Sequence, residues 1–102
     1  MIPRKILISH SQYTLRRIPQ KELLDDEGNE LLGRAYFNGQ LIVVAKGLQP
    51  DLEREVVMHE IIHTIDYHAG DTFTEAQIQT LGYNVLNVLK ANPNLRRYLF
   101  EE

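Results

Sequence analysis

Residues 50–70 read PDLEREVVMHEIIHTIDYHAG, and this stretch decides the expected fold. Its apolar residues recur at helical spacing from Leu52 onward and cover more than one stripe of the helix surface. Such a pattern is typical of a central and largely buried helix. Pro50 suits the first turn of a helix, and Gly70 suits the position just after its end. The stretch therefore predicts a central helix over about residues 50–68.

This helix contains the segment His59-Glu60-Ile61-Ile62-His63, an H-E-x-x-H motif. Side chains four residues apart lie one above the other on a helix, so both imidazoles can converge on one ion. Zinc is the usual metal at histidine sites that keep one coordination position open. Glu60 points beside such an ion, where it can act as general base toward metal-bound water. The motif favours a metal site over its alternative, two histidines on a solvated helix face.

A catalytic zinc needs a third protein ligand, and two carboxylates after the motif are the main candidates. Asp66 follows His63 by three residues on the same helix face. It could bind the ion directly, or orient a ligand imidazole from outside the coordination sphere. Glu75 follows a tight turn at Gly70 and shares a face with Gly82, which would let two helices approach closely. We expect Glu75 as the third ligand and keep Asp66 as the alternative.

Two overlapping capping boxes bear on the role of Glu75. Thr72 could cap a helix with Glu75 as the reciprocal partner, whereas Thr74 could cap it with Gln77 in that role. Only the second arrangement leaves the Glu75 carboxylate free for a metal.

The rest of the chain is typical of a small α+β domain. Residues 5–8 and 13–18 have strand-like patterning, and Asn38-Gly39 between two apolar runs suits a type I′ hairpin turn. We expect a small N-terminal antiparallel sheet with a hairpin over residues 32–45. The metal-binding helix and a second helix over about residues 73–90 follow it, and Asn92-Pro93 precedes a last short helix. All 102 residues are expected to form a single domain.

Composition excludes several classes of protein. The chain has 11 Lys and Arg against 14 Asp and Glu, so no attraction to nucleic acid or to an anionic membrane is expected. Cysteine is absent, which excludes disulfides, thiolate catalysis and cysteine-ligated metals. Neither a signal peptide nor an apolar run of the roughly 20 residues needed to span a bilayer is recognisable. We therefore expect a cytoplasmic protein.

The metal-helix segment resembles a known family. Residues 55–68 (EVVMHEIIHTIDYH), the segment from Thr74 to Ile78, and the helix that ends at Asn92-Pro93 are similar to small phage- and prophage-encoded metallopeptidases of the ImmA/IrrE type. The resemblance covers roughly residues 30–95 and implies a minimal zincin-like domain. It also implies that His59, His63 and Glu75 bind one zinc ion per chain, that Glu60 is the base, and that the protein acts inside a bacterial host cell.

The zincin-like fold implies further functional residues. In such folds, the sheet edge beside the metal helix binds substrate as an added strand, and here Ile42, Val43 and Val44 would supply that edge. An ordinary hairpin strand is the alternative. A helper that stabilises the oxyanion is also expected, and its candidates are Tyr67, His68 and Tyr83.

The expected function is that of a gluzincin-like zinc metallopeptidase, which hydrolyses peptide bonds through metal-activated water with Glu60 as general base. One alternative is a non-proteolytic binding or regulatory module that keeps the zincin fold, with or without metal. Another is a metal-dependent hydrolase of non-peptide substrates. About 100 residues leave little material for the second wall of a cleft. Three alternatives stay open for binding a peptide or protein substrate: a homodimer completes the cleft, a partner protein completes it, or the cleft opens only to an unfolded or extended chain.

Overall fold

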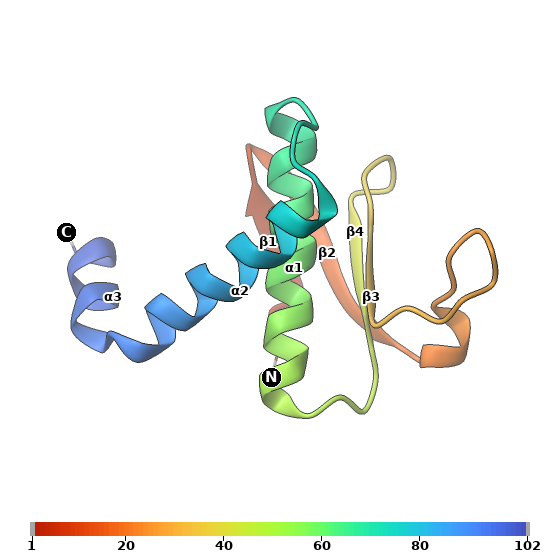
Figure 1. The fold of residues 1–102 in the computed structure, drawn as a ribbon, viewed down its shortest axis with the longest axis horizontal. Helices are drawn as coiled ribbons and strands as arrows, with labels where there is room; N and C mark the ends of the chain where they lie inside the picture. Colours follow the sequence, from red (N-terminus) through yellow and green to blue (C-terminus); the bar gives the residue numbers. More distant parts are fainter. Residues whose placement is uncertain (1, 102) are drawn as a thin grey trace.

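The computed structural model describes residues 2–101 of the chain. Its strands are β1 (Lys5–Ile8), β2 (Ser11–Ile18), β3 (Gly33–Tyr36) and β4 (Leu41–Ala45), with a short 3-10 helix η1 (Gln20–Glu22) after β2. Its helices are α1 (Pro50–Ala69), α2 (Glu75–Ala91) and α3 (Pro93–Phe100). The strands form one sheet, α1 lies along one face of it, and α2 and α3 extend away from α1 (Figure 1). The prediction of an α+β domain, with a small sheet followed by helices, is confirmed.

The sheet is mixed, so the expectation of an antiparallel sheet was wrong. The strand order is β1-β2-β4-β3, and the central pair β2 and β4 is parallel, with Leu15 opposite Ile42. The two outer pairs are antiparallel. Parallel strands need a crossover of about a dozen residues or more. Here residues 19–40, which contain η1 and β3, return the chain to the starting end of β2.

The predicted hairpin over residues 32–45 is formed by β3 and β4, but its turn is not type I′. Tyr36 pairs with Leu41, which leaves the four-residue loop 37–40, and in this loop only Gln40 has a positive φ, of 51°. The two-residue turn with positive φ at both positions lies between β1 and β2 instead, at Ser9 (48°) and His10 (69°). The pairing register decides the turn type here, because it leaves four residues to close the loop.

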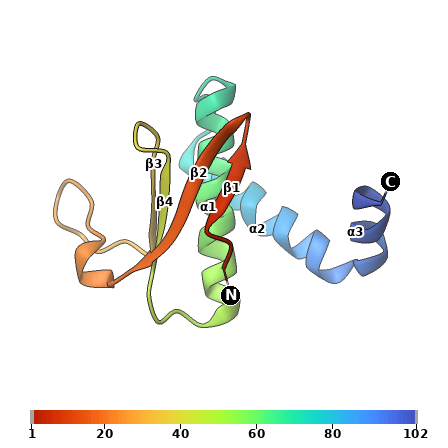
Figure 2. The same cartoon turned by 180° about the vertical axis from the view of Figure 1, so that it is seen from behind.

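Both faces of the sheet are covered by apolar side chains. Toward α1, Tyr13, Leu15 and Ile42 pack with Ile8 and with residues of the helix. On the opposite face, Val43 and Ala45 pack with Leu23 from the segment that follows β2. Figure 2 shows β1 and β2 in front of α1, which agrees with α1 covering a single face. Strand β4 therefore lies at the centre of the fold.

The helices agree closely with the predicted ranges. α1 is followed by Gly70, whose φ is 124°, and Thr74 caps α2. Ile65 on α1 is exposed, so α1 is central but less completely buried than its apolar pattern predicted. No helix in the described part of the chain combines the length and the hydropathy of a membrane-spanning segment.

Candidate metal centre

The two motif histidines and Glu75 come together between α1 and α2. Nε2 of His59 lies 2.7 Å from one carboxylate oxygen of Glu75, and Nε2 of His63 lies 2.9 Å from the other. One ligand atom from each residue lies within 4.8 Å of the others, so the three side chains can hold a metal ion. Within residues 2–101 this is the only such group of three His, Asp or Glu residues.

The turn between the helices positions Glu75. The Thr74 hydroxyl accepts a hydrogen bond from the Gln77 N–H at 3.1 Å, and the Gln77 side chain accepts one from the Thr74 N–H at 2.8 Å. This capping box starts α2 at Glu75 and leaves the Glu75 carboxylate free. Of the two arrangements that the sequence allows, the structure adopts the one compatible with a metal site.

Asp66 has neither of its two predicted contacts, with a metal ion or with a ligand imidazole. Its carboxylate accepts hydrogen bonds from the N–H groups of Thr72 and Phe73, at 3.0 and 3.1 Å. The residue is only 3% exposed, and its carbonyl accepts a further bond from the Asp71 N–H at 2.7 Å. Asp66 thus holds the turn that leads to Glu75, and the structure does not bring it into the metal cluster.

Glu60 lies beside the cluster and is 8% exposed. Burial raises the pKa of its carboxyl above the usual 4.5, the nearby His59 and His63 oppose that change, and Glu75 adds to it. A carboxyl with a raised pKa can accept and release a proton closer to neutral pH.

A cleft of about 600 Å³ opens in front of these residues. Its polar part contains the two histidines, Glu60 and Glu75. Its apolar part comes from the segment leading into β3, from β3 itself and from the first half of α1. These apolar lining residues are Leu31, Leu32, Ala35, Leu52 and Val56. The cleft can therefore accept an apolar group beside the cluster.

The edge strand beside this cleft is β3, not β4, so the prediction for Ile42, Val43 and Val44 was wrong. β4 lies between β2 and β3, and all three residues are buried. The run LIVVA is apolar throughout, which is typical of a strand covered on both faces. That continuity is the signal by which the sequence could have placed β4 inside the sheet.

Gly33 brings β3 close to α1. A Cβ atom at this position would lie 2.5 Å from Cγ1 of Val56 and 3.3 Å from Cγ of Glu60. Only a glycine lets the strand backbone approach the helix here without displacing a neighbour. Gly33 was not among the predicted site residues, and the sequence offered no signal for this contact beyond the glycine itself.

The three candidates for an oxyanion helper have separate surroundings. Tyr67 lies one helical turn beyond His63 and stacks on Phe37 of the β3–β4 loop, with ring centroids 4.1 Å apart. His68 Nε2 lies 2.9 Å from the Tyr13 hydroxyl. Tyr83 is exposed at the middle of α2. The structure does not bring His68 or Tyr83 to the cluster, and only Tyr67 shares the helix face of the two histidines.

The donor set fits zinc. Two imidazole nitrogens and one carboxylate form one of the ligand combinations found at catalytic zinc sites, which leave a fourth position open. In His59, Nδ1 is buried and has no hydrogen-bond partner among the described residues, so Nε2 is the nitrogen with a partner. Nε2 of each histidine faces the same carboxylate, as binding to a single ion requires.

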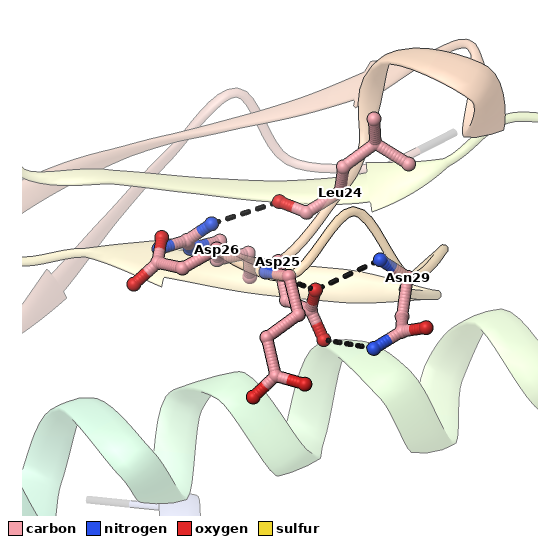
Figure 3. Close-up of polar contacts among 6 residues, drawn as sticks. Leu24, Asp25, Asp26 and Asn29 are labelled. Atoms are coloured by element: carbon pink, nitrogen blue, oxygen red, sulfur yellow. Dashed lines mark hydrogen bonds and ion pairs between the residues drawn. The ribbon is translucent and has the colours of Figure 1, made fainter.

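The acidic loop that precedes β3 is held by polar contacts among its own residues and with the sheet (Figure 3). The Asp25 carboxylate accepts hydrogen bonds from the backbone N–H groups of Glu27 and Asn29 and from the Asn29 side chain. Arg34 of β3 donates to the Leu24 carbonyl at 2.8 Å and pairs with Asp26. These contacts close the loop and fasten it to the edge strand.

Comparison of the chain with protein-family models, with curated proteins and with solved structures finds no match.

Proposed function

We propose that this protein is a zincin-like zinc peptidase of the ImmA/IrrE type, with His59, His63 and Glu75 as ligands and Glu60 as general base. The observation that carries the proposal is the convergence of Glu75, from a second helix, on both histidines of the H-E-x-x-H motif. Glu60 lies beside them at a cleft. The resemblance of residues 55–68 to this family supports the same conclusion.

Zinc bound to this ligand set would supply a water of pKa about 7 and a Lewis acid for the scissile carbonyl. Glu60 would accept the proton of the attacking water and pass it to the leaving amine. Burial of Glu60, which raises its pKa, suits both steps because the group must gain and then lose a proton. Tyr67, on the same face of α1, is the remaining candidate for contact with the oxyanion.

The substrate in this proposal is an extended segment of a peptide or protein. β3 ends the sheet beside the cleft, so the backbone groups on its outer edge can pair with an added strand. The net charge of −3 gives no reason to expect nucleic acid or an anionic membrane as the partner. Following the resemblance, we place the reaction in the cytoplasm of a bacterial cell.

The test combines elemental analysis with cleavage of an unfolded protein substrate. We expect about one zinc per chain in the wild type. Glu60→Gln should keep the zinc and lower cleavage by about 10²–10⁴-fold, the usual contribution of a general base. His59→Ala should lose both zinc and cleavage. Glu22→Gln and His10→Ala, which change the same residue types outside the site, should behave as the wild type.

Other outcomes would contradict the proposal. If Glu60→Gln cleaves the substrate at the wild-type rate, this mechanism is ruled out. Zinc bound without any cleavage would favour the alternative of a non-proteolytic binding or regulatory module. Absence of zinc after reconstitution would remove the metal from the function altogether.

A further inference from the structure

One carboxylate of α1 lines the metal cleft without an ion-pair partner. Glu55 lies four residues before His59, so the two side chains share a face of the helix, and both line the cleft. Glu55 is half-buried, and among residues 2–101 no ion pair engages its carboxylate. On α1, the acidic residues outside the cleft have fixed partners: Arg54 and Lys90 for Asp51, Arg17 for Glu53, and the turn N–H groups for Asp66.

The basic residues that share a cavity with Glu55 are bound elsewhere. In the metal cleft, Arg34 donates to the Leu24 carbonyl and pairs with Asp26. Glu55 also lines a second cavity, of about 570 Å³, between α1 and α2. The basic residues of that cavity bind Asp51 or backbone carbonyls, and they are Arg54, Lys90 and Arg96. The charge of Glu55 is therefore not neutralised within the described part of the chain.

A zinc ion in the proposed site would not neutralise this charge either. Its two positive charges would be balanced by the carboxylates of Glu60 and Glu75. The cleft would then keep the negative charge of Glu55 beside the apolar side chains of Leu52 and Val56. Apolar neighbours exclude water and so strengthen a polar contact made by this carboxylate.

The position of Glu55 along α1 indicates which part of a bound peptide it would meet. Four residues of helix rise about 6 Å, so Glu55 lies about one turn before His59. β3 runs along α1 in the same direction, because Gly33 lies at Val56 and Phe37 stacks on Tyr67. A strand added to β3 advances about 3.3 Å per residue. It would therefore pass Glu55 about two or three residues from the bond at the metal.

We propose that Glu55 binds a positively charged group of the substrate, about two or three residues from the bond that is cleaved. This inference deepens the proposed function and rests on it, because the ligand is the peptide substrate. A lysine or arginine side chain and a free α-ammonium group both carry the required charge. Either would donate charge-assisted hydrogen bonds to the carboxylate, and such bonds are among the stronger ones in proteins.

Peptide binding to the Glu60→Gln protein with zinc bound tests the role of Glu55 apart from hydrolysis. The peptides are acetylated and amidated chains of about eight alanine, serine and leucine residues, with one lysine or one glutamine at successive positions. At one or two positions, lysine should bind about 5–20-fold more tightly than glutamine. Adding Glu55→Gln should reduce this ratio of dissociation constants to about 1, and adding Glu55→Lys should favour glutamate peptides instead.

A matched control and a check of the fold accompany these variants. Glu22→Gln removes the same charge at an exposed position outside the cleft, so adding it to Glu60→Gln should keep the preference for lysine. Elemental analysis and circular dichroism of Glu55→Gln check that the variant keeps its zinc and its fold.

The glutamine peptide without its acetyl group separates the two sources of charge. Tighter binding of this peptide, lost in Glu55→Gln, would assign the α-ammonium group as the ligand. Tighter binding of an internal lysine, also lost in Glu55→Gln, would assign a side chain. Either result supports the proposal. In the wild type, mass spectrometry should place the cleaved bond about two or three residues from the preferred charge.

Three results would overturn the proposal: no peptide binds, no peptide with a positive charge binds more tightly, or the preference persists in Glu55→Gln. Cleavage at another distance from the charge would overturn its predicted position. A wild type that cleaves none of these peptides would contradict the proposed function instead. In that case the binding ratios of the Glu60→Gln proteins still decide whether Glu55 recognises a positive charge.

Discussion

The Cα atom of His59 lies 3.6 Å from the position that a Cβ atom on Gly82 would occupy. α1 and α2 therefore meet nearly backbone to backbone at the level of the first motif histidine. Glu75 is seven residues before Gly82, about two helical turns, so both lie on the face of α2 that is turned toward α1. Contact at Gly82 and the cap at Thr74 together fix where the Glu75 carboxylate stands.

Alanine at the two closely packed glycines should have opposite effects. At Gly82 the new methyl would meet its neighbours at 3.6–3.7 Å, an ordinary contact, so the higher helix propensity of alanine should raise the free energy of unfolding by up to about 1 kcal/mol. At Gly33 it would lie 2.5 Å from Val56 Cγ1, so Gly33→Ala should lower that free energy by about 1–3 kcal/mol. Urea denaturation of both variants measures the difference. Equal effects would show that β3 is not held against α1 as described.

Replacing Asp66 should lower stability without removing the metal. Asp66→Ala leaves the N–H groups of Thr72 and Phe73 without their acceptor, which should cost about 1–3 kcal/mol. Asp66→Asn keeps an acceptor oxygen at the same place and should cost less. Urea denaturation of both variants measures the loss of stability, and elemental analysis measures whether they keep zinc. A folded Asp66→Asn protein that has lost zinc would return Asp66 to the list of ligands.

If the proposed metal site is right, zinc should stabilise the fold, because the three residues that could hold it come from both α1 and α2. A ligand at 100 times its dissociation constant adds about 2.7 kcal/mol. In a domain of this size that corresponds to a rise in Tm of about 10–20 °C. A chelator should reverse the rise, and Glu75→Ala should show little of it. Thermal denaturation followed by circular dichroism measures these shifts, with His10→Ala as control. An equal rise in Glu75→Ala would place zinc elsewhere.

Acid should remove the contribution that one ion pair between the sheet and α1 makes to the free energy of unfolding. Arg17 of β2 donates two hydrogen bonds to Glu53, at 2.7 and 2.8 Å, and these bonds hold the pKa of the Glu53 carboxyl below its usual 4.5. The pair stabilises the fold above pH 4.5, and this stability is lost as the pH falls through the lowered pKa.

Glu53→Gln tests this pH dependence. It should be less stable than the wild type at neutral pH, and the two proteins should converge in strong acid. Urea denaturation across this range gives the comparison. A difference that persists unchanged in strong acid would mean that the charge of Glu53 is not its source.

The sequence predicted the local features well. The apolar pattern of residues 50–70 predicted α1, and the H-E-x-x-H spacing with the Thr74 capping box predicted the approach of Glu75 to both histidines. These features depend on residues close in sequence. The sheet order was missed because the parallel pairing of Leu15 with Ile42 joins residues 27 apart and leaves no local signal. The two-residue turn predicted at Asn38-Gly39 was wrong for a similar reason. The pairing of the whole of β3 with β4 sets the register, and this register leaves four residues in the loop.

The turn between α1 and α2 constrains how this chain can vary in evolution. Thr72 and Phe73 contribute backbone N–H groups to the Asp66 carboxylate, so their side chains are free to change. The length of the turn is constrained, because an inserted or deleted residue would displace the N–H groups that face the Asp66 carboxylate. Such a displacement would also move the Thr74 cap, and with it the start of α2 and Glu75. Descendants that retain the cluster should therefore tolerate substitutions of Thr72 and Phe73, but they should keep Gly70, the Thr74 cap and the number of residues between α1 and α2.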